Sequence, residues 1–299
     1  MPEGMRTVLL VSLLAAVLAE AADCPLPPLS AGRPTPGKRV AVTPPEYADT
    51  QVHHLIALPD DWSADWQARG KRWPVIAEYT GNLHPASGST GEVEGASLGY
   101  GVARGRAIWI VLPYVAKDHR KNEATWWGDL EATVGYAKTN LPRICAEFGG
   151  DAKKVVLCGF SRGAIGVSFV GLHDDEVAQL WCGFWAHDHF DGVSAWSPPW
   201  GAPLARYRAE ASVRISRLAA RPLLISQGHA SDETQRFVET IATRNVEYLT
   251  VDMARLYGKF PNDAVKHAHN DRWPLRDGEA ATCARAWFER VTGMEKAAR

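Results

Sequence analysis

Short apolar runs alternate with amphipathic segments along the chain from about residue 50 onward. Runs of consecutive apolar residues predict strands, and apolar positions that recur every three or four residues predict helices. The predicted strands cover 52–58, 74–79, 107–112, 155–158, 180–186, 222–226 and 246–251, and the two longest predicted helices cover 127–148 and 278–291. Strands that alternate with helices favour a mostly parallel sheet with helices on both faces, so we predict an α/β domain over residues 49–299.

The strand at 155–158 is followed by an unusual turn. It runs into Gly159-Phe160-Ser161-Arg162-Gly163, and a further apolar segment, predicted to be helical, covers 164–170. Strand, Gly-x-Ser-x-Gly and helix in this order are typical of a nucleophile elbow, a tight and strained turn that exposes its serine. Ser161 is therefore predicted to be a catalytic nucleophile.

A second Gly-x-Ser-x-Gly segment shows that the motif is not sufficient by itself. Ser97 lies in Gly95-Ala96-Ser97-Leu98-Gly99, but the polar residues 91–94 precede it in place of a buried strand. We therefore predict that Ser97 lies in a loop or at a short helix.

A serine hydroxyl needs an imidazole to take its proton. In a parallel α/β sheet, such a partner lies on a loop at the carboxyl end of a later strand. The segment after strand 246–251 contains His267 and His269. We prefer His269 as the base because it opens the sequence His-Asn-Asp-x-Trp, and His267 is the alternative.

A carboxylate must in turn orient the imidazole. Asp232 follows the strand 222–226 on a glycine-containing loop and is the predicted acid, although it could instead cap a helix over 233–241. Asp188 and Asp191, which follow the strand 180–186, are the alternative acids.

The elbow at Ser161, with its partners in this order, resembles the α/β-hydrolase superfamily and most of all its exported serine esterases. The resemblance covers about residues 50–292 and implies an oxyanion hole made by two backbone N–H groups. One belongs to the residue after the nucleophile, Arg162. The other comes from the loop after an early strand, where Gly81 and Asn82 are the candidates because the usual His-Gly-Gly pattern is absent.

Aromatic and polar residues near the ends of the same strands are candidates for substrate binding. The region 190–217 is rich in Trp and Pro and is predicted to form a small cap. The predicted substrate-binding residues are Trp126, Trp127, His187, Trp196 and Trp273. The cluster His187-Asp188-His189-Phe190-Asp191 could also bind zinc or calcium, but substrate contact or a buried polar network is favoured, and no metal or cofactor is predicted.

The N-terminal residues have the pattern of an export signal. Arg6 precedes an apolar run over 8–19, and Ala19-Glu20-Ala21 offers a cleavage site, so residues 1–22 are predicted to be a signal peptide. The run is too short for a lasting membrane span, although an uncleaved anchor is the alternative. The proline-rich residues 23–48 are predicted to form an extended linker or wrapping arm.

Composition narrows the possible partners. The 299 residues are 46% hydrophobic and 22% charged with a net charge of −1, and no basic patch indicates nucleic-acid binding. Of the five cysteines, Cys158 and Cys182 lie in apolar runs and are predicted to be buried thiols. One bridge among Cys24, Cys145 and Cys283 remains open, because a secreted chain permits disulfides.

These features together predict a secreted or periplasmic serine hydrolase that cleaves carboxylic esters through an acyl-enzyme. Export and the tryptophan-rich rim favour esters carried on polysaccharide, such as acetyl or feruloyl groups, although a small-molecule ester fits as well. The alternatives are an exported serine peptidase and a non-catalytic, surface-binding domain of the same fold.

Overall fold

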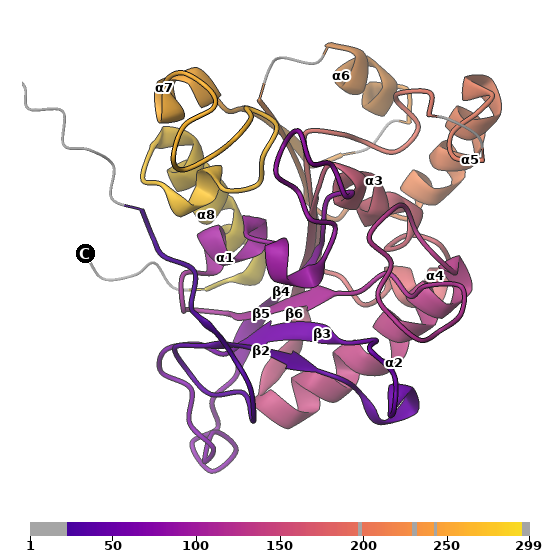
Figure 1. Cartoon of the computed structure of the whole chain (residues 1–299). Coiled ribbons are helices and arrows are strands. Elements are labelled where there is room, and N and C mark those ends of the chain that lie inside the picture. The colour runs from indigo at the N-terminus through magenta and orange to yellow at the C-terminus, as the bar shows by residue number, and fades with distance from the viewer. Residues whose placement is uncertain (1–22, 197–198, 229–231, 242–243, 295–299) are drawn as a thin grey trace, which may run out of the picture.

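A nine-stranded sheet with helices on both faces forms the centre of the molecule (Figure 1). The computed structural model describes residues 23–196, 199–228, 232–241 and 244–294, so the predicted signal peptide at 1–22 lies outside the described residues. The strand order is β1-β2-β3-β5-β4-β6-β7-β8-β9. The strands are β1 (Leu29–Ser30), β2 (Arg39–Val42), β3 (His54–Ala57), β4 (Trp73–Tyr79), β5 (Ile108–Leu112), β6 (Gly150–Phe160), β7 (Gly183–His187), β8 (Leu223–Gln227) and β9 (Val246–Thr250).

The strands from β5 to β9 run parallel, and β3 pairs antiparallel with β5. The predicted α/β architecture is therefore confirmed, with strand limits that differ by a few residues. The largest difference is β6, which starts at Gly150 rather than at 155. Its first half carries the exposed residues Ala152 and Lys153, so the apolar pattern marks only the buried half.

The proline-rich arm contributes to the sheet, which its composition did not predict. Within residues 23–48, β2 pairs antiparallel with β3, and β1 pairs parallel with β2. The prolines flank β2 rather than interrupt it, so each residue of this strand keeps its backbone N–H for the sheet.

Two apolar cores lie on opposite faces of the sheet. One core packs the helices α2 (Leu130–Phe148), α3 (Arg162–Phe169), α5 (Leu204–Ser216) and α6 (Asp232–Glu239). The other packs α1 (Leu98–Ala103), α7 (Met253–Tyr257) and α8 (Glu279–Thr292). The short helix α4 (Asp175–Ala178) completes the first layer, and Figure 1 shows α1 and α8 on the side of the sheet away from α2.

The ends of α2 show why this long helix forms where it does. Its N-cap Asp129 accepts a hydrogen bond from the N–H of Ala132, and Gly149 ends it with a left-handed φ of 79°. Its buried side chains include Val134, Leu141 and Ile144, as the spacing predicts.

The described part of the chain contains no helix long and apolar enough to cross a membrane. The five cysteines, all of which are described, are free thiols, so no bridge forms among Cys24, Cys145 and Cys283.

Candidate active site

Ser161 occupies a sharp turn between β6 and α3. Its backbone has φ 55° and ψ −116°, a strained combination for a residue with a side chain. A Cβ on Gly159 would lie 2.2 Å from the carbonyl oxygen of Gly163, and one on Gly163 would lie 1.9 Å from that of Tyr79. Only glycine fits at both positions, so these two residues of the motif are required for the turn.

Three side chains form a continuous hydrogen-bonded chain at this turn. The Ser161 hydroxyl lies 2.9 Å from Nε2 of His269, and Nδ1 of His269 lies 2.8 Å from Oδ2 of Asp188. The other carboxylate oxygen of Asp188 accepts a hydrogen bond of 2.7 Å from the N–H of Gly228. The structure thus brings together Ser161, His269 and Asp188, the last of which sequence reasoning ranked behind Asp232.

The expected contact between Asp232 and His269 is not present. Asp232 is the first residue of α6 and is exposed. The reason lies in the order of the strands: β7 is hydrogen-bonded to β6, whereas β8 is one strand further away. A carboxylate at the end of β7 therefore lies beside the elbow.

The alternative acid Asp191 and the alternative base His267 have other partners. Asp191 is fully buried and pairs with Arg214 through two hydrogen bonds of 2.8 and 3.0 Å, which ties the segment after β7 to α5. His267 is exposed, and its Nδ1 accepts a hydrogen bond from the backbone N–H of His269. Neither residue occupies the position of acid or base next to Ser161.

The surroundings of Asp188 keep it ionised. Burial opposes the charged form, but the imidazoles of His187 and His269 and the N–H of Gly228 outweigh it and hold the pKa of this carboxyl well below its usual range. An ionised Asp188 accepts the Nδ1–H of His269 and so leaves Nε2 free to accept the serine proton.

Two predicted substrate-binding residues lie behind this chain, out of reach of a substrate. His187 and Trp273 are fully buried. The indole N–H of Trp273 donates to Nε2 of His187 at 3.0 Å, and Nδ1 of His187 lies 3.1 Å from the carbonyl oxygen of Ser226. They brace the segment that carries His269, because Nε2 of His187 also lies 3.1 Å from the carbonyl oxygen of Asn270.

Trp127 is also not a substrate contact. It is buried, and its ring stacks on that of Phe169 at 4.9 Å and meets that of Tyr114 at 5.6 Å. Its neighbour Trp126 is half-buried, and the two indole rings meet edge to face at 5.7 Å.

Trp126 and Trp196 do line a pocket with Ser161. This pocket of about 320 Å³, here called the tryptophan pocket, has Trp126, Trp196 and Ile165 as its apolar residues. The two indole rings lie 5.5 Å apart at 70°, an edge-to-face arrangement. His84, His189, His267 and His269 complete much of the lining.

The described residues contain no group of three histidine, cysteine, aspartate or glutamate side chains that could hold a metal ion.

The side chain of Arg162 makes contacts that the Gly-x-Ser-x-Gly motif did not predict. Its guanidinium group is buried and donates to the carbonyl oxygens of Trp126 at 2.6 Å and Gly81 at 3.0 Å, and to the Thr80 hydroxyl at 3.1 Å. It also lies 4.1 Å from the centre of the Tyr114 ring. Burial without a paired carboxylate among the described residues lowers its pKa to about 10.

The guanidinium of Arg162 thus joins two segments near the candidate oxyanion hole, the loop at Gly81 and the segment at Trp126. Asn82 accepts a hydrogen bond of 2.8 Å from the N–H of Trp126, which also fixes the loop. Within the described residues, no hydrogen bond engages the backbone N–H groups of Gly81, Asn82 or Arg162. They are therefore available to a substrate oxygen near Ser161.

Removing this cation is expected to loosen the oxyanion loop. Arg162→Met should lower kcat by roughly 10²-fold, the order of effect of losing one oxyanion donor, with a smaller change in KM. The measurement is steady-state hydrolysis of p-nitrophenyl acetate, with added guanidinium ion as a rescue of Arg162→Ala. Arg143→Met, which removes an exposed arginine of α2, is the control and should stay within twofold. A kcat of Arg162→Met within threefold of wild type in a folded protein contradicts this role.

Glu78, in the strand that leads into this loop, binds the start of α1. It is fully buried and accepts hydrogen bonds from the N–H groups of Leu98 and Gly99 and from the indole of Trp109. Burial and the nearby carboxylate of Asp271 raise its pKa to about 8. Ser97, the serine of the second motif, is buried beside it at the start of α1.

Comparison with solved structures identifies the architecture. An esterase, Est22, solved with p-nitrophenol superposes with a TM-score of 0.51 at 13% identity, over 81% of this chain and 76% of that one. The chain has the α/β-hydrolase fold. The isopeptidase AtxE2 superposes with a TM-score of 0.50 at 16% identity, over 86% of this chain and 40% of the isopeptidase.

The likeness extends to the fold only. A thermostable esterase superposes with a TM-score of 0.48 at 12% identity, over 84% of this chain, and the chain spans 62% of that esterase. No family model matches the sequence. Any activity of this α/β-hydrolase-fold protein must therefore be argued from its own side chains.

Proposed function

We propose that this protein is a serine hydrolase that cleaves carboxylic esters through an acyl-enzyme. The observation that carries the proposal is the chain of hydrogen bonds from Ser161 through His269 to Asp188. Ser161 begins this chain in a strained turn that opens into the tryptophan pocket.

The geometry supports a two-step reaction. Oγ of Ser161 attacks the ester carbonyl carbon while Nε2 of His269 takes the hydroxyl proton and Asp188 stabilises the imidazolium. The carbonyl electron pair moves to the oxygen, which the N–H of Arg162 and that of Gly81 or Asn82 hold. Collapse breaks the bond to the alcohol oxygen, which leaves with the proton from His269. Water then repeats the sequence and frees the acid.

The proposed substrate class rests on the pocket and on the signal peptide that the sequence predicts at residues 1–22. Trp126 and Trp196 offer an apolar slot for the acyl group next to Ser161. With export of the chain to a secreted or periplasmic location, this favours esters borne on polysaccharide, carrying acetyl or feruloyl groups. A triad of this kind also attacks amides, so a peptidase is the second candidate within the same fold.

A fluorophosphonate probe tests the proposal, because only an activated serine reacts with it. We expect stoichiometric labelling of the purified protein, mapped by peptide mass spectrometry to Ser161, together with hydrolysis of p-nitrophenyl acetate. Hydrolysis of p-nitroanilides at a comparable rate would favour the peptidase. An unlabelled Ser161 in folded protein would instead indicate a non-catalytic binding domain.

A further inference from the structure

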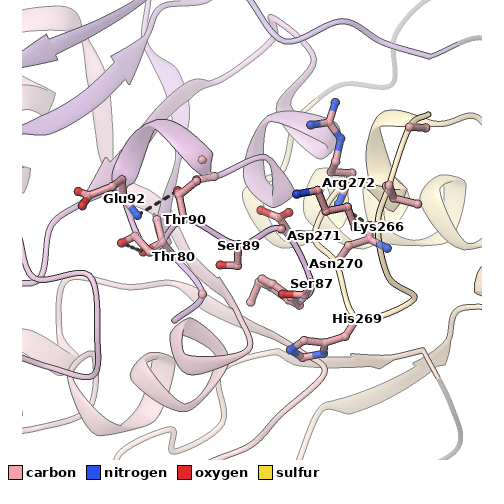
Figure 2. Close-up of a pocket in the computed structure, with 18 of the residues that line it drawn as sticks. Thr80, Ser87, Ser89, Thr90, Glu92, Lys266, His269, Asn270, Asp271 and Arg272 are labelled. Atoms are coloured by element: carbon pink, nitrogen blue, oxygen red, sulfur yellow. Dashed lines mark hydrogen bonds between the residues drawn. The ribbon is translucent and has the colours of Figure 1, made fainter. Parts of the chain in front are cut away.

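A second cavity adjoins the candidate active site on the other side of His269. It has a volume of about 290 Å³ and lies between residues 80–96, which follow β4, and residues 262–272, which follow α7 (Figure 2). We call it the polar cavity. Phe160, the residue before the nucleophile, forms part of its lining.

The polar cavity and the tryptophan pocket share one functional side chain. His269 lines both, whereas Ser161 lines only the tryptophan pocket. Gly81 lines the polar cavity and Asn82 lines the tryptophan pocket. The oxyanion loop and His269 thus stand between the two spaces.

The two spaces differ in chemistry. In the tryptophan pocket, Trp126, Trp196 and Ile165 form an apolar part of the lining. Hydroxyls, carboxylates and two cations line the polar cavity: Thr80, Ser87, Ser89, Thr90, Glu92, Asp263, Asp271, Lys266 and Arg272. Because charges of both signs alternate with hydroxyls, the lining matches a neutral group that both donates and accepts hydrogen bonds better than one strong charge.

Several of these polar groups have capacity left for a ligand. Among the described residues, the hydroxyl of Ser89 and the ammonium of Lys266 have no hydrogen-bond or ion-pair partner. Asp271 accepts the N–H of Ser97 on Oδ2 at 3.0 Å, which holds this carboxylate in the lining of the cavity. Figure 2 shows Lys266 and Asp271 on the side of the cavity opposite Thr90 and Glu92.

The position of His269 relates this cavity to the departing alcohol of the proposed reaction. In the proposed mechanism, the imidazole returns its proton to the departing alcohol oxygen, so that oxygen must lie next to Nε2. The acyl group stays on Ser161, in the tryptophan pocket. The alcohol extends away from the acyl group, and the polar cavity, which His269 also lines, is the neighbouring space for it.

We propose that the polar cavity binds the alcohol portion of the substrate, and that this alcohol is a sugar ring. The inference rests on the proposed ester hydrolysis and adds the location at which the sugar binds. At about 30 Å³ for each water in the liquid, the volume of about 290 Å³ corresponds to roughly ten waters, on the scale of one sugar ring with its hydroxyls.

Two esters of the same acid test the proposal: ethyl ferulate and a feruloylated monosaccharide. We expect wild-type kcat/KM to be at least tenfold higher for the sugar ester. Lys266→Met and Ser89→Ala should each reduce this preference by about threefold to tenfold, the effect of losing one hydrogen bond. Lys266 is exposed, so its substitution leaves folding intact. Lys117→Met, an exposed lysine away from both spaces, is the matched control and should keep the wild-type preference.

The outcomes separate this inference from the proposed function. Hydrolysis of ethyl ferulate without any preference for the sugar ester overturns the inference and leaves the esterase proposal standing. A preference that persists undiminished in both variants also overturns it, because the sugar then binds elsewhere. Failure of the wild-type protein to hydrolyse either ester or to react with a fluorophosphonate overturns both.

Discussion

Replacing Ser161 by alanine is expected to lower kcat for p-nitrophenyl acetate by about 10⁵-fold to 10⁶-fold. The substitution removes the only atom that forms the acyl bond, while the N–H groups around the pocket remain. The small residual rate would come from binding and from the oxyanion hole. Initial rates at saturating substrate measure the loss, and a thermal melt checks that the fold is unchanged.

Ser97 is the matched control, because it is the serine of the second Gly-x-Ser-x-Gly segment. Its hydroxyl donates to the backbone carbonyl of Asp271 and is buried, so Ser97→Ala alters packing without removing a nucleophile. We expect a loss of activity below tenfold. If Ser161→Ala keeps more than a hundredth of the wild-type rate after contaminating esterases are excluded, the assignment of the nucleophile is wrong.

Asp188→Asn is expected to lower kcat by about 10⁴-fold, the effect of the same exchange in a serine protease triad. An asparagine amide cannot stabilise the imidazolium, and it presents a donor where His269 offers its Nδ1–H. The favoured imidazole tautomer then carries its proton on Nε2, where it can no longer accept the proton of Ser161. Since the imidazoles of His187 and His269 and the N–H of Gly228 outweigh the effect of burial and keep Asp188 ionised far into the acid range, the native triad should not lose activity through this carboxyl above about pH 5.

Asp232→Asn is the matched control for Asp188→Asn. Asp232 is exposed at the start of α6, and its exchange should leave kcat within twofold of wild type. The reverse pattern, a large loss for Asp232→Asn and a small one for Asp188→Asn, would mean that the acid comes from the loop after β8.

The contrast between these two carboxylates shows what the sequence could predict. Ser161 was predictable because the strand, the two glycines and the helix are adjacent in the chain, so the cause of the turn is local. His269 was predictable because the last loop of a parallel sheet has few histidines to offer. The acid depends on which strand lies beside β6, and the order of strands in a sheet is set by long-range pairing.

Side-chain direction accounts for most of the remaining differences. Trp126 and Trp127 are neighbours in sequence, yet one lines the tryptophan pocket and the other packs in the core. Residue type does not report which of the two is buried, because that depends on the side chains from other segments that pack on each ring. The guanidinium of Arg162 was missed for a related reason, because its partners are backbone carbonyls, which no sequence pattern identifies.

The contacts of Arg162 also couple the two halves of the candidate site. One guanidinium holds the carbonyl oxygen of Gly81, in the candidate oxyanion loop, and that of Trp126, in the wall of the tryptophan pocket. An acyl group too large for the pocket would displace Trp126 and, through this shared cation, the donors that stabilise the transition state. An ester with such an acyl group would then show a lower kcat with little change in KM. Esters that bind weakly and esters that react slowly would therefore be different molecules.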